Sequence, residues 1–290
     1  MRPQRYGPFP YVPINRRPKL AWPNGARVAL WVIPNIETFP LDEPVPGGTG
    51  KAPDLINWAP RDYGNRVGVF RVMETLARHG VRGTVALNSE VCDDCPQIVE
   101  DALKLGWEFM GHNQSNARYL PAMSPEEERR VVLGTFERIE KATGVRPRGW
   151  LSSGLQESWH TLDYLVEAGA SYVADWVNDD QPYVMTVGGA RLCSIPYSTE
   201  LNDLPQIVRA GRSSDEFELM IRRQFDTLYR EGADSGRVMA ICLHPFVIGV
   251  PHRIGALDSA LGYILRHEAV WCATGSEIVE HFLAAPGAVF

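Results

Sequence analysis

The chain lacks the features of membrane, secreted and nucleic-acid-binding proteins. No hydrophobic run approaches the roughly 20 apolar residues that a membrane helix needs, and the first residues, MRPQRYGPFPYVP, contain no apolar core of the signal-peptide kind. Five cysteines are an odd number, which does not indicate a disulfide framework. A net charge of -6 with scattered basic residues argues against a surface for nucleic acid. We therefore expect a cytoplasmic protein that binds neither membrane nor nucleic acid.

Most of the chain alternates between predicted strands and predicted helices. The first 26 residues, rich in Pro and Arg, are predicted to form an extended arm, and residues 27–290 a single catalytic domain. Predicted strands cover 27–33, 81–88, 107–111, 147–151, 172–175, 192–196, 238–243 and 269–274. Predicted helices cover 67–79, 96–105, 124–143, 158–168, 215–231, 257–266 and 275–283.

The connection between the first strand and the first helix is predicted to be one long loop, residues 34–65, of a length that usually serves a site or an interface. The alternation, without a Gly-rich phosphate fingerprint, favours an α/β fold, a distorted (β/α) barrel of about seven strands. The Pro-rich arm and the long loop also lead us to expect a homo-oligomer, which light scattering would test.

Polar residues follow the predicted strands at the points where catalytic groups of such barrels lie. They are Glu37, Asn88, His112, Trp150, Ser152, Asp175, Tyr197 and His244. Because so many strands end in this way, we predict one site that is assembled from the whole chain.

One of these strand ends is similar to a metal-binding motif with one ligand replaced. In Gly111-His112-Asn113-Gln114-Ser115-Asn116, the His at the first position is followed four residues later by Asn116. A His-x-x-x-His pair holds divalent ions because imidazole nitrogens suit zinc and its neighbours. The amide of Asn116 is a weak neutral ligand by comparison. This substitution decides whether the chemistry depends on a metal.

Six segments in order resemble the polysaccharide deacetylase (carbohydrate esterase) superfamily, and more closely its allantoinase-like branch, which acts on small cyclic amides. The resemblance runs from about Arg27 to Phe282. The segments are Val32-Ile-Pro-Asn-Ile-Glu37, Gly111-His112-x-x-x-Asn116, Arg146-Pro-Arg-Gly-Trp150, Ala174-Asp-Trp-Val-Asn-Asp-Asp-Gln-Pro-Tyr183, Ile195-Pro-Tyr-Ser-Thr-Glu-Leu-Asn-Asp203 and Cys242-Leu-His-Pro245.

The resemblance implies catalytic roles for Glu37, His112 and His244. Members of the family use an acidic pair after the first strand, two His ligands spaced as above and a late His as general acid. Glu37 then matches the acidic position, which supplies a base and a metal ligand, His112 the first metal His, and His244 the acid. This sequence departs from the family in having a single acid near Glu37, Asn116 for the second His, and Leu151 for an Arg that orients the base.

These departures weaken the case for a metal. One carboxylate, one imidazole and one amide lack most of the charge and basicity that bind zinc, so we expect no cofactor or a weakly bound divalent metal, zinc first, on Glu37 and His112. Glu37 would then deprotonate water, provided that burial raises its pKa toward the working pH. His112 and Asn116 would donate to the developing oxyanion, and His244 would protonate the leaving nitrogen.

Further residues are candidates for substrate contact. Trp150 is an aromatic wall candidate, Asp180 and Glu200 are polar residues of the family-like segments, and His252 and Arg253 follow a Gly-Val-Pro turn and are candidates for an anionic group. Each has a structural alternative, as a core side chain, a cap or a solvated surface group.

The function predicted from these residues is hydrolysis of a non-peptide C–N bond in a small amide or cyclic amide (a ureide, imide or lactam). Two alternatives stay open. One is a metal-dependent de-N-acetylase of a soluble sugar, which zinc binding would favour. The other is a catalytically inactive barrel that binds a small ligand or a partner protein, against which the retained Glu37, His112 and His244 argue. Lyase or lactonase chemistry on the same scaffold is a weaker alternative.

Overall fold

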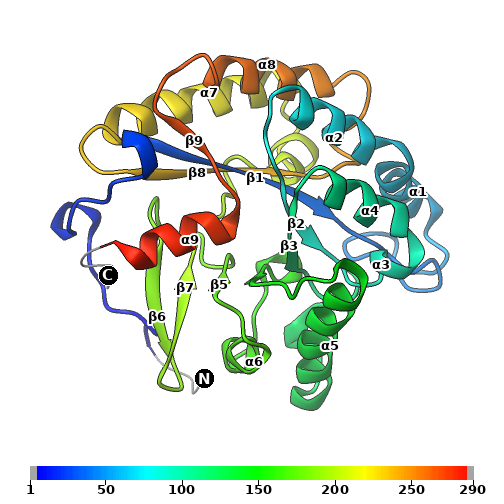
Figure 1. The fold of residues 1–290 in the computed structure, drawn as a ribbon. Helices are drawn as coiled ribbons and strands as arrows, with labels where there is room; N and C mark the ends of the chain where they lie inside the picture. The colour runs from blue at the N-terminus through cyan, green and yellow to red at the C-terminus, as the bar shows by residue number, and fades with distance from the viewer. Residues whose placement is uncertain (1–4, 286–290) are drawn as a thin grey trace.

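The computed structural model describes residues 5–285, which form a curled, mostly parallel sheet with helices packed outside it (Figure 1). The strands are β1 Val28–Ile36, β2 Thr84–Leu87, β3 Glu108–Gly111, β4 Gly149–Trp150, β5 Tyr172–Val173, β6 Tyr183–Val187, β7 Ala190–Ser194, β8 Arg237–Leu243 and β9 Val270–Cys272. The sheet follows the order β6-β7-β5-β4-β3-β2-β1-β8, and β9 pairs with β1. The distorted (β/α) barrel that the sequence predicts is confirmed.

The α-helices are α1 Leu55–Tyr63, α2 Val69–Arg78, α3 Val91–Asp94, α4 Pro96–Lys104, α5 Pro125–Thr143, α6 Thr161–Ala168, α7 Ser214–Glu231, α8 Ile254–Ile264 and α9 Gly275–Ala284. Two π-helical segments, η3 Gly64–Gly68 and η6 Leu204–Arg209, precede α2 and α7. Short 3-10 turns are η1 Ile14–Arg16, η2 Pro23–Gly25, η4 Leu120–Ala122 and η5 Ser153–Leu155. No helix within residues 5–285 is long and apolar enough to cross a membrane.

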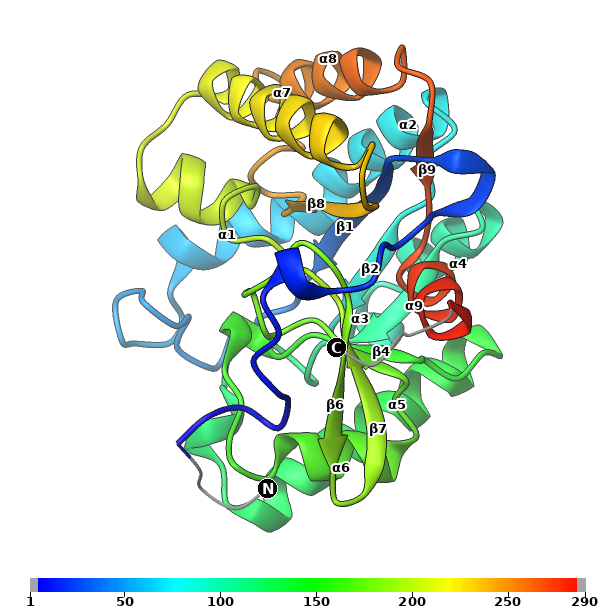
Figure 2. The same cartoon turned by 90° about the vertical axis from the view of Figure 1, so that its left-hand side faces the viewer.

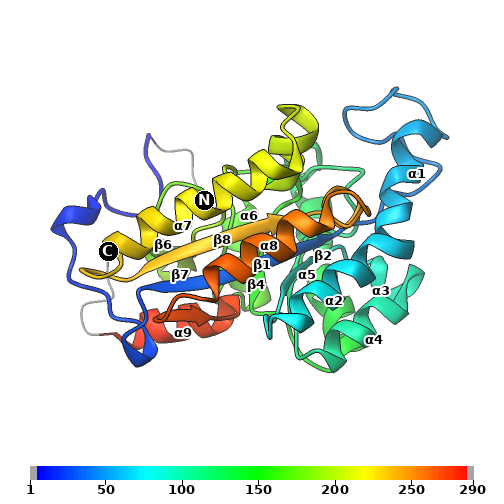
Figure 3. The same ribbon diagram turned by 90° about the horizontal axis from the view of Figure 1, so that it is seen from above.

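Strand β1 divides the hydrophobic core into two layers. Its nine residues are all buried, as an unbroken apolar run in a parallel sheet predicts. Trp31 and Ile33 face the inside of the curled sheet, whereas Leu30 and Val32 face the outer helices. Helices α7 and α8 pack against each other over β8 and β1, as Figure 3 shows from above. Because both sides of β1 are packed, its carboxyl end is a rigid support for the residues that follow it.

The structure corrects two predictions about elements. The segment predicted as a loop over residues 34–65 begins with the end of β1 and contains helix α1. Helix α1 has no buried residue and contains Pro60, so it has neither the apolar period nor the stop signal that identifies a helix. The β6–β7 hairpin was also missed, which brings the sheet within residues 5–285 to nine strands. Its turn, Gly188-Gly189, has positive φ at both residues and is a known hairpin signal.

The N-terminal arm packs on its own chain along the open side of the sheet (dark blue in Figure 2). The end strands of the sheet order, β6 and β8, do not pair with each other. The arm contacts both: Thr186 N–H donates to Pro8 O at 2.9 Å, and Gly236 N–H donates to Leu20 O at 2.7 Å. It therefore covers the gap in the barrel wall.

Candidate active site

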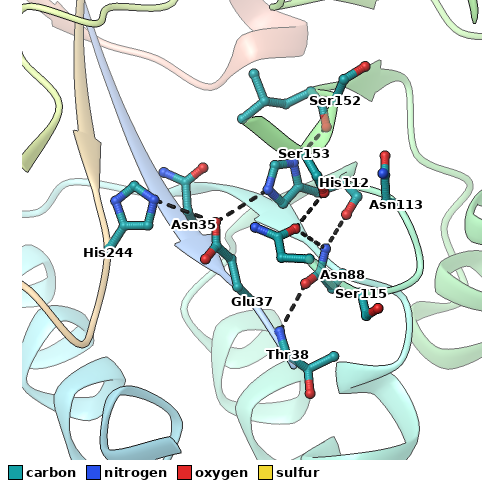
Figure 4. Close-up of polar contacts among 12 residues, drawn as sticks. Asn35, Glu37, Thr38, Asn88, His112, Asn113, Ser115, Ser152, Ser153 and His244 are labelled. Atoms are coloured by element: carbon teal, nitrogen blue, oxygen red, sulfur yellow. Dashed lines mark hydrogen bonds and ion pairs between the residues drawn. The ribbon is translucent and has the colours of Figure 1, made fainter. Parts of the chain in front are cut away.

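The carboxyl ends of four neighbouring strands bring the predicted catalytic residues together. Glu37 follows β1, His112 follows β3 and His244 follows β8, while Asn88 follows β2. All three catalytic candidates are buried, with exposed fractions of 9% for Glu37, 3% for His112 and 4% for His244. Figure 4 shows both imidazole rings directed at the Glu37 carboxylate. Parallel pairing of these strands is the reason that residues 207 positions apart share one site, as from Glu37 to His244.

Glu37 lies between the two histidines. Its Oε1 is 3.5 Å from His112 Nε2 and 3.5 Å from His244 Nε2. The backbone oxygen of Glu37 accepts a hydrogen bond from Asn65 Nδ2 at 2.8 Å, which ties this residue to the π-helical segment before α2. The carboxylate is thus held at the centre of the site from two directions.

His244 is oriented by a buried carboxylate. Asp203 Oδ1 is 2.7 Å from His244 Nδ1, and both carboxylate oxygens accept the backbone N–H of His244, at 3.0 and 2.8 Å. Asp203 is fully buried. Because a carboxylate here accepts only, Nδ1 of His244 carries a proton, and Nε2 is the atom that faces Glu37 and the cavity.

The charges of the site reinforce one another. Burial alone would raise the pKa of Glu37, but the charge of His244 and contacts with both imidazoles outweigh it and hold this pKa well below its usual range. Burial alone would lower the pKa of His244, but Glu37 and Asp203 together raise it to about 9. The pair is therefore a carboxylate with an imidazolium at neutral pH. The expectation of a raised pKa for Glu37 is wrong, because the neighbouring imidazoles lower this pKa by more than burial raises it.

The tautomer of His112 follows from its partner. His112 Nδ1 lies 2.6 Å from the backbone oxygen of Leu151, which can only accept, so Nδ1 carries the proton. In the neutral imidazole, Nε2 is then an acceptor. His112 donates to an oxyanion through Nε2 only when it is protonated.

The amide of Asn116 is oriented by Asn88. Thr38 N–H donates to Asn88 Oδ1 at 2.9 Å, and Asn88 Nδ2 donates to the backbone oxygen of His112, which fixes the Asn88 amide (Figure 4). Asn88 Nδ2 also donates to Asn116 Oδ1 at 3.0 Å, and Ser153 Oγ donates to the same oxygen. Both acceptor positions of that oxygen are used. Asn116 therefore offers its Nδ2 donor to the cavity that it lines.

A cavity of about 180 Å³ lies over these residues. Its lining includes Asn35, Glu37, Phe39, Arg61, His112, Asn116, Tyr119, Leu151, Ser152, Tyr197, Asn202, Arg209, His244 and Phe246. Asn35 is locked, since its Nδ2 donates to Ile33 O and Leu243 O while its Oδ1 accepts from Tyr197 Oη at 3.2 Å. The volume is below the range typical of pockets for drug-sized ligands. It fits a small molecule.

Comparisons with known proteins agree with this architecture. Residues 61–173 match the polysaccharide deacetylase family model. A curated Schizosaccharomyces pombe protein named as a polysaccharide deacetylase is 28% identical over 240 residues, which are 77% of this chain and 75% of that protein. A Pseudomonas aeruginosa PAO1 structure described as a polysaccharide deacetylase has a TM-score of 0.83 at 26% identity, covering 92% of this chain and 95% of that one. The resemblance to the polysaccharide deacetylase superfamily that the sequence indicates is thus confirmed.

The structure of Puue allantoinase is also a near neighbour. Its TM-score is 0.84 at 25% identity, with 92% of this chain and 94% of that chain covered. The resemblance to the allantoinase-like branch that the sequence indicates is thus confirmed as a similarity of the whole fold.

The side chains of the site do not supply enough ligands for the divalent metal ion that the resemblance implies. The oxygen of Asn116 is occupied by two donors, and Nε2 of His244 bears a proton at neutral pH because Asp203 and Glu37 stabilise it. Glu37 and the Nε2 lone pair of His112 are then the remaining ligands. Within residues 5–285 no group of three His, Cys, Asp or Glu side chains is arranged to hold a metal ion. Two ligands are too few for a closed zinc site.

The structure places the other predicted contact residues outside this cavity. Trp150 is fully buried, stacks on Phe136 at 5.8 Å between ring centroids, and donates to Ser152 Oγ. Asp180 and Glu200 line a second cavity of about 570 Å³ between the arm and the barrel. Arg253 lies at the start of α8 and donates to Val247 O, and neither it nor its neighbour His252 lines the catalytic cavity.

Sequence reasoning missed the roles of several residues of the site. Asp203 belongs to a family-like segment, but nothing in the sequence pairs it with a histidine 41 positions away. Arg61 lies within the segment that was predicted to be a loop, and Arg209 lies in the π-helical η6. The strand-end rule identifies residues that follow strands and cannot identify residues supplied by helices.

Proposed function

We propose that this chain hydrolyses the C–N bond of a small amide, and specifically of a cyclic amide such as a ureide, imide or lactam. The observation that carries the proposal is the Glu37–His244–Asp203 series at the base of a small cavity, with Glu37 ionised and His244 protonated. Glu37 can therefore accept a proton and His244 can give one. Because the charge of His244 is what chiefly holds the pKa of Glu37 low, the carboxylate becomes a stronger base as His244 gives up its proton.

The reaction follows from these positions. Glu37 takes a proton from water as the water oxygen bonds to the amide carbonyl carbon. The carbonyl oxygen becomes anionic and accepts a hydrogen bond from Asn116 Nδ2, which Asn88 and Ser153 hold in place. His244 transfers its Nε2 proton to the departing nitrogen, and the C–N bond breaks. The products are a carboxylic acid and the protonated leaving nitrogen, which is an amine from a lactam, an amide from an imide and a urea group from a ureide. The two stay joined in one molecule when the substrate is a ring.

We propose that no metal takes part, because the donor set supplies two ligands. The small cavity supports a small substrate, and the similarity to Puue allantoinase favours a cyclic ureide. The second candidate, metal-dependent de-N-acetylation of a soluble sugar, is favoured by the name of the S. pombe relative and by the family model. It requires a metal ligand that moves into the site from elsewhere.

The test combines metal analysis with turnover. Protein purified without chelator or added metal is analysed for zinc, manganese and cobalt per chain, and is then assayed with allantoin, hydantoin, dihydrouracil and succinimide, beside N,N′-diacetylchitobiose. We expect turnover of a cyclic amide that chelators do not abolish. Glu37→Gln and His244→Ala should each lower kcat at least about a hundredfold, the usual scale for acid and base groups. Near-stoichiometric metal with turnover of the sugar alone would replace the proposal by its alternative.

A further inference from the structure

Arg61 is an arginine of the catalytic cavity without an acidic partner. It extends from α1, and its guanidinium lies over the rings of Phe39 and Phe246, 4.8 and 5.1 Å from their centroids. Other arginines, such as Arg66 with Asp62 and Arg82 with Glu277, form ion pairs. Within residues 5–285, Arg61 forms none.

The hydrogen bonds of Arg61 are also incomplete. Its Nη1 donates to Asn57 O at 2.6 Å, whereas its Nε is buried and has no acceptor among the described residues. A guanidinium has five N–H donors in a planar fork that matches a carboxylate. Stacking between two aromatic rings limits its rotation, so the fork is preorganised. The N–H groups that its own helix leaves unused are available to a ligand in the cavity that Arg61 lines.

The charge balance of the cavity favours an anion. Among the described residues that line it, Glu37 is the one acid, against Arg61 and Arg209. Arg61, Arg209 and Tyr119 all line this cavity, and the charges of both arginines oppose the rise that burial causes in the pKa of Tyr119. The charge of Glu37 acts on the pKa of Arg61, but the two side chains form no ion pair, so the guanidinium fork stays open to a ligand.

We propose that Arg61 is a specificity-determining residue and that the substrate is a small amide that carries a carboxylate, which the Arg61 guanidinium binds while the scissile carbonyl lies at Glu37. This inference rests on the proposed amide hydrolysis and names its substrate class. A carboxylate in the cavity also arises when a cyclic amide opens, so the test must separate a substrate carboxylate from a product carboxylate.

The experiment compares two substrates that share a ring and differ in charge, hydantoin-5-acetate and hydantoin-5-acetamide, with the wild-type chain, Arg61→Gln, Arg61→Lys and Arg66→Gln. Arg66 is the matched control, because it is exposed and paired outside the cavity. We expect the wild type to prefer the acid. Arg61→Gln should raise KM for the acid about 10- to 100-fold, the scale of a lost charge-assisted hydrogen bond, with KM for the amide unchanged. The KM of Arg61→Lys for the acid should lie between those of the wild type and Arg61→Gln.

Calorimetry with N-carbamoylglycine, the ring-opened product of hydantoin, separates the other outcomes. Equal turnover of acid and amide, with product binding that depends on Arg61, overturns the substrate assignment and leaves amide hydrolysis intact. No turnover of either compound, with Arg61-dependent binding of hydantoin-5-acetate, overturns the proposed function and leaves the carboxylate site. Loss of folding in Arg61→Gln, seen by circular dichroism, makes Arg61→Lys the deciding variant. No effect of either Arg61 variant overturns the inference.

Discussion

At the scale of single residues, the site is a set of side chains whose partners fix their protonation and orientation. Asp203 fixes the ring of His244, Leu151 O fixes the tautomer of His112, and Asn88 fixes the amide of Asn116. In each case the group that faces the cavity is decided by a second residue behind it. A substitution of Asp203 or Asn88 should therefore change the chemistry without touching the substrate, whereas the backbone oxygen of Leu151 stays whatever its side chain.

The pH dependence of activity is the first prediction at this scale. The pKa of His244 is raised to about 9, so the general acid is present at lower pH and is lost as pH rises through about 9. We expect kcat/KM to fall above about pH 9, since this parameter reports the free enzyme. Asp203→Asn removes the negative partner, so the falling limb should move down toward the ordinary His pKa of about 6.5, and its plateau should drop.

The same titration contributes to stability with a defined sign. Because the folded-state pKa of His244 lies above the unfolded one, its contribution to stability is complete below about pH 6.5 and is lost as pH rises through about 9.

The matched control for the pH dependence of kcat/KM is Asp258→Asn, since Asp258 pairs with His79 at 2.9 Å on the surface. That variant should leave the falling limb in place. A limb that stays near pH 9 in Asp203→Asn would contradict the assignment of the acid to His244.

The sequence predicts these residues unequally. Glu37, His112 and His244 follow buried strands, and parallel strands place such residues together, so their meeting was predictable. Asp180 and Glu200 belong to family-like segments but line the cavity under the arm, where Arg17 pairs with Asp179. Tertiary contacts of this kind have no signature in local spacing.

At the scale of elements, a contact between glycines positions His244. The turn after β8 packs against η3 and the start of α2 so closely that a Cβ on Gly68 would lie 2.2 Å from Pro245 O. A Cβ on Gly249 would lie 2.5 Å from Gly68 O. The main chain of η3 thus packs directly against the residues that follow the general acid His244.

Gly68→Ala tests this contact. The added methyl must push the Pro245 backbone away, so we expect a loss of about 1–3 kcal/mol in the free energy of unfolding, the usual cost of overpacking, and a lower kcat. Gly134→Ala is the matched control: Gly134 lies within α5, and its added Cβ would meet nothing within 4 Å. It should gain about 0.5–1 kcal/mol, since Ala is the better helix former. Urea unfolding measures the stability of both variants. If Gly68→Ala and Gly134→Ala changed the free energy of unfolding equally, the close packing at Gly68 would be refuted.

Element boundaries were predictable where local signals exist. Ser124 caps α5 by accepting from Glu127 N–H, and Gly144 ends that helix with positive φ, so the bounds agree with the helix predicted over 124–143. Helix α1 could not be identified in this way, because it has no buried residue to give an apolar period and its one proline argues against a helix. It is the element that supplies Arg61, so the lining of the cavity was only partly predictable.

At the scale of the whole molecule, the barrel is open and the arm completes its wall. Between β6 and β8, Val238 N–H donates to Asp180 O at 2.9 Å, and Arg17 reaches from the arm to Asp179. The arm therefore packs on its own chain. The homo-oligomer that the sequence suggests stays a prediction, to be measured by light scattering.

The ion pair between Arg17 and Asp179 should be a main attachment of the arm. Both side chains are largely buried, with exposed fractions of 7% and 11%, and Asp179 also accepts the backbone N–H groups of Asp180 and Gln181. Asp179→Asn leaves the guanidinium without its charge partner, so we expect a loss of about 3 kcal/mol in the free energy of unfolding.

The control is Asp234→Asn in the pair with Lys19, where exposed fractions are 73% and 64%. That change should not be measurable, because solvent screens exposed pairs. If urea unfolding gave the same free energy of unfolding for both variants, the Arg17–Asp179 pair would not attach the arm, and the arm would not stabilise the open side between β6 and β8 through this contact.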